Sequence, residues 1–241
     1  MNTLLAPTKT QVGSRPRIPS TLPPLQTGDV LTRAEFERRY KAQPNIKNAE
    51  LIEGIVYMSS PVHFLQHGKP HAHVMLWLGT YLASTKGIWF ADNTTVRLDA
   101  ENEVQPDACL CLPEQSGGQT KVSKDDYLEG APELIVEIAA SSTSYDMHQK
   151  KRVYARNGVK EYLVFQVYEQ KVDWFVWREG VYEPLTSDEQ GIWRSELFPG
   201  LWLNAAAFWD DDLATLLQVL QHGLATPEHQ TLAASLLTAK A

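Results

Sequence analysis

Residues 131–165 read "APELIVEIAASSTSYDMHQKKRVYARNGVKEYLVF", and this stretch decides the class of fold. The apolar run "ELIVEIA" predicts a buried strand, and "EYLVF" predicts a second one. Between them, "DMHQKKRVYARNG" is typical of a helix that ends with Gly158 as its C′ residue. We therefore expect an α/β domain with a mixed sheet.

A glutamate, Glu137, lies inside the first of these strands. Strand alternation turns Ile135, Glu137 and Ala139 to one face. A buried, unpaired carboxylate costs roughly several kcal/mol, so it needs a cation, a metal or strong hydrogen-bond donors. The alternative is an edge strand that exposes Glu137 to water, which is the commoner situation for a single glutamate. The surrounding apolar run weighs against that alternative.

The predicted helix carries Asp146, Lys150 and Tyr154 at intervals of four residues, so these side chains share one face. One interpretation is an exposed ion pair between Asp146 and Lys150, worth about 0.3 kcal/mol. The other is that the helix returns Lys150 toward Glu137. A lysine there could orient or activate a water and stabilise phosphorane charge, while carboxylates hold a divalent metal.

A second carboxylate follows a proline in "VQPDACLCL", residues 104–112, which we expect to be a strand. Pro106 cannot donate to a strand ladder, so it marks an edge or a bulge that redirects the side chain of Asp107. Considered alone, Asp107 could equally be a turn residue. Together, Asp107, Glu137 and Lys150 are what metal-assisted phosphodiester hydrolysis requires, and carboxylate oxygens suit Mg²⁺ or Mn²⁺.

The composition sets limits on the class of protein. Apolar residues make up 43% and charged residues 21%, which is typical of a soluble globular protein. The net charge of −7 argues against a sequence-independent nucleic-acid coat but not against a nuclease. Cys109 and Cys111 are too few for a disulfide scaffold or a cysteine-based zinc site, so we expect a reducing, cytoplasmic setting. Neither a membrane-spanning run nor a secretory signal is expected.

The chain divides into three expected parts. Residues 1–30 form a flexible Pro/Ser/Thr-rich arm, residues 31–210 a nuclease-like domain, and residues 211–241 a C-terminal helical extension. Within the domain we expect a hairpin in "AELIEGIVYMSS" that bends at Gly54, and a helix that begins near Pro70. The C-terminal helices either pack on the domain or pair two chains.

Four stretches together resemble the Uma2 (Uma-two) family of restriction endonucleases, a branch of the PD-(D/E)XK nuclease superfamily. They are "ELIEGIVYMSSP", "QPDA", "PELIVEIAASSTSYD" and "KKRVYARNGVKEYLV". The last is similar to the family's Lys-x-x-x-Tyr-x-x-x-Gly-Val-x-Glu-Tyr pattern, and the resemblance covers roughly residues 31–209. It implies a restriction-endonuclease-like core, in which a central, four-stranded mixed β-sheet is flanked by helices.

The resemblance also implies site residues. Asp107 and Glu137 match the family's metal ligands, and Glu53 matches its early acidic position, where it could contact a second metal; a structural strand-end glutamate is the alternative. The superfamily pattern places a lysine two residues after the glutamate, where this chain has Ala139. We therefore expect Lys150, with Lys151 as the alternative, to supply that lysine from the following helix.

Histidines are concentrated in "HGKPHAH", residues 67–73. His67 aligns with a histidine common in the family and could approach the scissile phosphate. The alternative, an ordinary hydrogen-bonded histidine at a helix start, is favoured. A zinc site that uses His67 and His71 is a minor interpretation, because zinc demands further nitrogen or sulfur ligands.

The expected function is a Mg²⁺-dependent (or Mn²⁺-dependent) endonuclease that acts on DNA, with Asp107, Glu137, Lys150, Glu53 and His67 as its site. The alternative is a catalytically silent nuclease-like fold that binds nucleic acid or supports assembly. The sequence does not separate DNA from RNA or a nucleotide as substrate. A homodimer, which could cut two strands, is an expectation from the resemblance.

Overall fold

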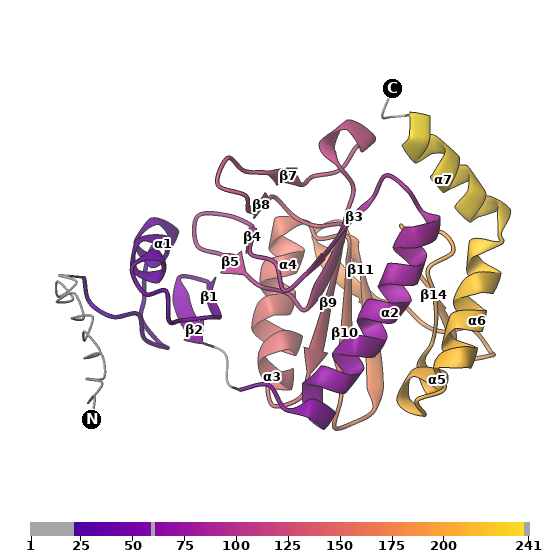
Figure 1. Ribbon diagram of the computed structural model, residues 1–241, viewed down its shortest axis with the longest axis horizontal. Helices are drawn as coiled ribbons and strands as arrows, with labels where there is room; N and C mark the ends of the chain where they lie inside the picture. Colours follow the sequence, from indigo (N-terminus) through magenta and orange to yellow (C-terminus); the bar gives the residue numbers. More distant parts are fainter. Residues whose placement is uncertain (1–21, 59–60, 239–241) are drawn as a thin grey trace, which may run out of the picture.

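The computed structural model describes residues 22–58 and 61–238. Its main sheet has the strand order β12-β11-β10-β9-β6-β3 and lies at the centre of the molecule (Figure 1). The strands are β3 (Trp89–Asp92), β6 (Ala108–Cys111), β9 (Leu134–Ala139), β10 (Glu161–Gln166), β11 (Lys171–Arg178) and β12 (Val181–Pro184). β10 runs parallel to β9 and the other neighbours pair antiparallel, so the expected mixed sheet is confirmed.

This sheet has six strands, whereas the resemblance implied a central core of four. One edge is extended by the β11–β12 hairpin, which turns at Glu179 and Gly180. Both residues have positive φ, 48° and 94°, as a tight two-residue hairpin turn requires. The opposite edge is formed by β3, which pairs antiparallel with β6.

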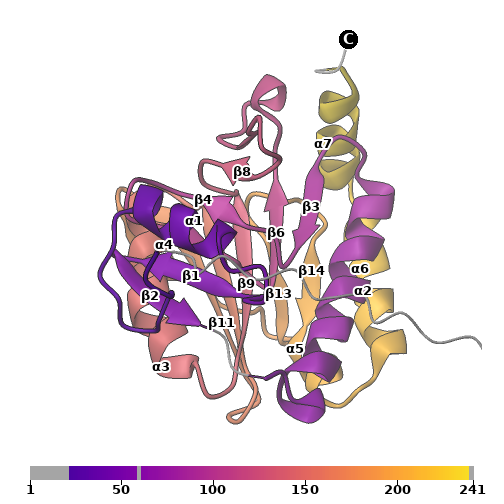
Figure 2. The ribbon, with the colours of Figure 1, turned by 60° about the vertical axis from the view of Figure 1, so that its left-hand side comes forward.

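Helices cover both faces of the main sheet (Figures 1 and 2). One face packs against α2 (Lys69–Ser84) and α6 (Leu213–Leu224); the other packs against the continuous helical segment α3 (Thr143–Tyr145), η3 (Asp146–Lys150) and α4 (Lys151–Asn157). On β9, Leu134 and Val136 pack on the face covered by α2 and α6, and Ile135 packs on the opposite face. By the same alternation, Glu137 faces the helical segment that follows its strand.

A smaller sheet stands beside this core, with the strand order β2-β1-β5-β4-β8-β7. Leu25 and Val30 belong to the expected N-terminal arm; Leu25 is buried next to α1 (Arg33–Lys41), and Val30 bridges to Ile55. The rest of the expected arm, residues 1–21, lies outside the described residues. The strands of the smaller sheet are β1 (Ala49–Ile52), β2 (Ile55–Met58), β4 (Val96–Arg97), β5 (Glu103–Val104), β7 (Lys121–Val122) and β8 (Leu128–Glu129), with η2 (Glu114–Ser116) before β7.

The C-terminal segment packs on the domain. Leu216 and Leu220 of α6 and Leu236 of α7 (Pro227–Thr238) join the main core, and each fully buried leucine contributes about 1.5–3 kcal/mol. Ahead of α6 lie β13 (Ile192–Arg194), β14 (Trp202–Asn204) and α5 (Ala205–Trp209). Within the described part of the chain, no helix is both long and apolar enough to cross a membrane.

Candidate active site

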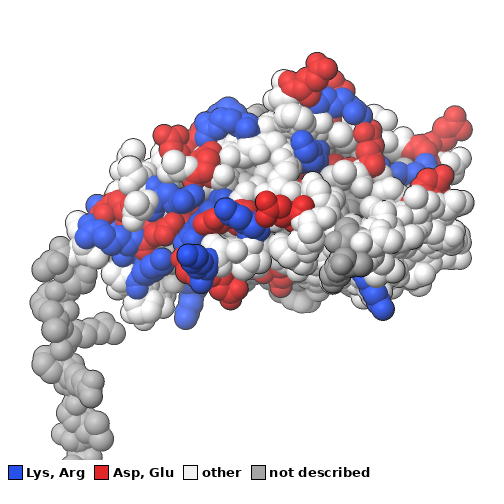
Figure 3. Space-filling view, turned by 90° about the horizontal axis from the view of Figure 1, so that it is seen from above, with Lys and Arg blue, Asp and Glu red and all other residues white. Residues whose placement is uncertain are grey.

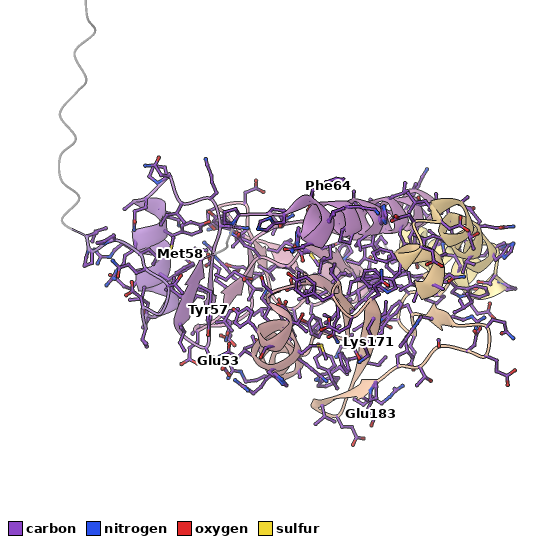
Figure 4. The ribbon with its side chains drawn as sticks, turned by 90° about the horizontal axis from the view of Figure 1, so that it is seen from below. Glu53, Tyr57, Met58, Phe64, Lys171 and Glu183 are labelled. Atoms are coloured by element: carbon purple, nitrogen blue, oxygen red, sulfur yellow. The ribbon has the colours of Figure 1, made fainter. Side chains whose placement is uncertain are left out.

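A cavity of about 420 Å³ opens where the β1–β2 hairpin, η1 (Phe64–Gly68), the end of β9 and the start of the following helical segment meet. Figure 4 shows Tyr57 and Met58 on the hairpin and Phe64 at the start of the helical stretch that continues into α2. The titratable side chains that line this cavity include Glu50, His63, His67, Asp107, Glu137, Asp146 and Lys150. Four of them carry carboxylates.

Glu137 is buried on β9, with only 3% of its surface exposed. Its Oε1 accepts hydrogen bonds from Lys150 Nζ at 3.0 Å and from the Tyr154 hydroxyl at 2.7 Å. The predicted approach of the helix face to the strand is therefore present, and the edge-strand alternative does not apply. Burial raises the pKa of Glu137, and the Lys150 ammonium opposes that rise.

Lys150 joins three of the four carboxylates. Its Nζ lies 3.0 Å from Glu137 Oε1, 3.1 Å from Glu50 Oε1 and 3.7 Å from Asp146 Oδ1. Burial alone would lower the pKa of this lysine, but the three carboxylates raise it well above its ordinary value. Lys150 is therefore an ammonium ion. Asp146 is also buried, which raises the pKa of its carboxyl group although Lys150 opposes the rise.

A π-helical turn, η3, delivers Asp146 and Lys150 to the cavity. Turns of this kind are uncommon within helices and occur frequently at functional sites. The helix continues through α4 to Gly158, whose φ of 79° is the left-handed conformation expected of a C′ glycine. The segment thus ends where the sequence predicts, and it presents Asp146, Lys150 and Tyr154 to β9.

Asp107 occupies the break between two strands rather than a bulge within one. β5 ends at Val104 and β6 begins at Ala108, because Pro106 has no N–H to continue a ladder. Asp107 Oδ2 accepts a hydrogen bond from the Ile138 backbone N–H at 2.7 Å, which fixes the carboxylate beside the strand of Glu137. The strand expected over residues 104–112 is therefore interrupted at residues 105–107, where Asp107 lies.

His67 lies on the other side of Asp107. Its Nε2 is 3.2 Å from Asp107 Oδ1, and this interaction raises the pKa of His67 despite partial burial. His71 Nε2 lies 3.0 Å from Asp92 Oδ1 and 3.3 Å from the backbone oxygen of Asp107, and its ring stacks on that of His67. In the regions that the structure describes, no group of three or more His, Cys, Asp or Glu side chains is arranged to hold a metal ion. Among these described residues, His67 and His71 therefore have no third ligand of this kind beside them in a zinc-binding arrangement.

The structure does not bring Glu53 to the cavity. Glu53 occupies the turn between β1 and β2 with a φ of 51°, and its carboxylate binds Arg152 at 2.6 and 3.0 Å. Figure 4 shows Glu53 at the outer end of the hairpin. The cavity instead receives Glu50, three residues earlier. A usable signal was present: Glu50 sits between Ala49 and Leu51 in an apolar strand, the same pattern that drew attention to Glu137.

Lys151 is likewise directed away from the carboxylates. Its Nζ lies 3.4 Å from the centroid of the Phe175 ring, a cation–π contact on the sheet side of α4. Of the two lysines considered for the site, the structure therefore brings only Lys150 to Glu137. Lys151 has a stabilising contact of its own, which accounts for its presence without a role in the cavity.

The donor set of the cavity suits a divalent cation. With all four carboxyl groups ionised, Lys150 protonated and both His63 and His67 neutral, the formal charge of the cavity is three units negative. Hard carboxylate oxygens are the ligands that Mg²⁺ and Mn²⁺ favour. Asp107 precedes β6, the neighbour of the strand that carries Glu137, and Glu50 and Glu137 both contact the Lys150 ammonium. Glu50, Asp107 and Glu137 are therefore the acidic candidates for binding such an ion, although the described residues do not form a ready three-ligand cluster.

The profile of the Uma2 family, whose description is "Putative restriction endonuclease", matches residues 33–206. No curated protein matches. A crystal structure from Anabaena variabilis ATCC 29413, described as "a putative nuclease belonging to DUF820", superposes with a TM-score of 0.53 at 12% identity, covering 79% of this chain and 99% of that one. At this identity the likeness concerns the fold, and it confirms the expected nuclease-like architecture.

Proposed function

The chain belongs to the Uma2 family, and on that premise we propose that it is a metal-dependent endonuclease that hydrolyses phosphodiester bonds in DNA. One observation carries the proposal. The buried carboxylates of Asp107 and Glu137 come from adjacent parts of the sheet, and the Lys150 ammonium lies 3.0 Å from Glu137. Carboxylates beside a lysine in a cavity are the groups that metal-assisted attack of water on a phosphodiester needs.

Each residue has a role in this proposal. Asp107 and Glu137 would hold Mg²⁺ or Mn²⁺ together with Glu50, and the ion when bound polarises the phosphate and lowers the pKa of a water. Lys150 places a positive charge among the carboxylates, where it would offset negative charge that develops on the phosphate. His67 keeps the Asp107 carboxylate in position through Nε2, at 3.2 Å from Oδ1.

The charge distribution agrees with substrate binding at the cavity rather than over a broad, positively charged surface. On the face shown in Figure 3, Lys and Arg side chains are interspersed with Asp and Glu. The chain as a whole carries a formal charge of −7. Attraction of a DNA backbone by the protein surface is therefore weak, and divalent cations bound among the carboxylates would supply much of the positive charge that the substrate requires.

The test is cleavage of supercoiled plasmid in Mg²⁺ or Mn²⁺ by the full chain and by Glu137→Gln and Lys150→Met. We expect nicking by the wild type and a loss of about 100-fold or more in each variant, the scale seen when an electrostatic contact to a transition state is removed. Glu183→Gln and Lys171→Met are matched controls, because these residues lie on the β11–β12 hairpin away from Glu53 and Tyr57 (Figure 4).

Circular dichroism and thermal melting establish that each variant is folded. If the wild type binds DNA but does not cut it in either metal, the chain is a silent nuclease-like binding module instead. If only Lys150→Met retains activity, the carboxylates act without the lysine and its role in this proposal is wrong. RNA and a dinucleotide, assayed in parallel, show which phosphodiester is the preferred substrate.

A further inference from the structure

Tyr145 is a cavity residue to which the proposed chemistry gives no role. It closes α3 and lines the cavity together with Glu50 and Lys150. Its ring packs against the ring of Tyr57, with 4.5 Å between the centroids, and Lys150 Nζ lies 5.6 Å from its centroid. Contacts on two sides therefore hold the ring in one place at the edge of the carboxylate cluster.

The hydroxyl of Tyr145 is buried, and it has no hydrogen-bond partner among the residues that the structure describes. Buried tyrosine hydroxyls normally have one. Two neighbours show the ordinary situation: the Tyr57 hydroxyl donates to Gln149 Oε1 at 3.0 Å, and the Tyr154 hydroxyl donates to Glu137 Oε1 at 2.7 Å. An unpaired donor in a cavity wall is a cost to folding that a bound ligand would remove.

The chemistry of the cavity indicates which ligand. Four of its charged side chains are hydrogen-bond acceptors, and a phosphodiester, which is also an acceptor, needs donors. The Lys150 ammonium is shared among Glu50, Glu137 and Asp146, and His67 is engaged with Asp107. The Tyr145 hydroxyl has no hydrogen-bond partner among the described residues, so it can donate to a ligand. As a neutral donor, it can approach an anionic oxygen without adding charge to the cluster.

We propose that the Tyr145 hydroxyl donates a hydrogen bond to a non-bridging oxygen of the substrate phosphodiester. Tyr145 is then a substrate-binding residue of the site, a role that rests on the proposed function. The contact involves no proton transfer, because the phenol remains protonated and only donates. The Tyr57 and Lys150 contacts fix the ring in advance, so little side-chain freedom is lost when the substrate binds.

Removing a single oxygen tests this inference. Tyr145→Phe keeps the ring, and because the lost hydroxyl has no described partner in the free protein, the melting temperature should stay the same or rise. Plasmid cleavage measured as kcat/KM should fall about 10- to 100-fold, the range for a hydrogen bond to a charged group. The affinity for Mn²⁺, measured by calorimetry, should be unchanged because the carboxylates are intact.

Two further tyrosines serve as controls. Tyr154→Phe removes a hydroxyl that is paired with Glu137, so it should lower the melting temperature, which Tyr145→Phe should not do. Tyr168→Phe alters an exposed tyrosine, 57% accessible, and should change neither stability nor cleavage. The inference is overturned if Tyr145→Phe cleaves DNA like the wild type, or if it melts lower, which would mean that the hydroxyl has a structural partner.

A binding measurement separates this inference from the proposed nuclease activity. If the wild type does not cleave, fluorescence anisotropy with a labelled DNA oligonucleotide in Mn²⁺ compares the wild type with Tyr145→Phe directly. Binding weakened by about tenfold keeps the role of Tyr145 while the hydrolytic proposal fails. Equal affinity in the two proteins, or no binding by the wild type, overturns the role of Tyr145.

Discussion

Lys150 Nζ lies 3.0 Å from Glu137 Oε1, although the two residues are 13 positions apart in the chain. The approach arises because the helical segment after β9 folds back along the face to which Glu137 points. Ala139 lies two positions after the glutamate, where the superfamily pattern has a lysine, and packs in the same cluster as Val153 and Tyr154 of α4. A small residue there lets α4 lie close to the sheet, and the helix supplies the ammonium ion.

This arrangement predicts that Lys150 stabilises the metal-free fold. Lys150→Met should lower the free energy of unfolding by about 3 kcal/mol or more, because the buried carboxylates of Glu50, Glu137 and Asp146 lose their shared counter-ion. Urea denaturation in the presence of a chelator measures this change. Mn²⁺ should restore part of the lost stability, since a cation can replace the missing ammonium.

A matched control is Lys171→Met. Lys171 is exposed and pairs with Asp173 at 2.7 Å, and an exposed pair of this kind is worth at most about 1 kcal/mol. If Lys150→Met unfolds at the same urea concentration as the wild type, the ammonium is not the counter-ion that holds the carboxylates together.

A second prediction separates the two glutamates of the β1–β2 hairpin. Glu50→Gln should reduce DNA cleavage by about 100-fold, because Glu50 lines the cavity and contacts Lys150 Nζ at 3.1 Å. Glu53→Gln should stay within about threefold of the wild type, because its carboxylate is paired with Arg152 on the surface and a surface pair contributes little. Single-turnover cleavage assays of both variants check this. The opposite ranking would restore Glu53 to the site.

A third prediction concerns metal binding at Asp107. Asp107→Asn keeps the shape of the side chain and retains an oxygen that can accept the Ile138 N–H hydrogen bond, so the fold should persist. The affinity for Mn²⁺ should drop by about tenfold or more, because an anionic ligand becomes neutral. Isothermal titration calorimetry measures the affinity, and Asp92→Asn, whose carboxylate contacts His71, is the control. An unchanged affinity would mean that Asp107 is not a ligand.

Local patterns in the sequence were sufficient to predict much of the fold. Glu137 within an apolar run, the four-residue spacing of Asp146, Lys150 and Tyr154, and the glycine at 158 each have a short-range physical cause, and the structure agrees with all three. Strand alternation and helical periodicity fix these relationships over a few residues. The mixed sheet followed from the same patterns.

What the patterns did not supply was the carboxylate of the β1–β2 hairpin. The family pattern pointed to Glu53, which lies in the turn, whereas Glu50, between apolar residues of β1, lines the cavity. The four-residue spacing favoured Lys150 over Lys151, and the structure brings Lys150 to Glu137 through a π-helical turn that helical periodicity alone does not predict. Family patterns align positions, but they do not show which side chain faces a cavity.

The last prediction concerns a carboxyl group outside the cavity. Glu103 on β5 is 4% exposed, and its Oε2 lies 3.4 Å from Arg97 Nε. Burial, together with the nearby charge of Glu37, raises the pKa of Glu103 from 4.5 to about 7, against the opposing effect of Arg97. The folded state therefore holds this proton more tightly than the unfolded chain does. Stability is lost as the pH rises from about 4.5 to about 7 and stays level above that.

Glu103→Gln removes this titration. The free energy of unfolding of the variant minus that of the wild type should be larger at pH 8 than at pH 5. The increase should be on the order of 3 kcal/mol or less. Urea denaturation of both proteins at the two pH values gives the difference. Glu196→Gln, which alters an exposed carboxylate paired with Arg178, is the control. If the stability difference between Glu103→Gln and the wild type is the same at both pH values, Glu103 does not titrate in this range. The buried pair with Arg97 then keeps the carboxylate charged throughout.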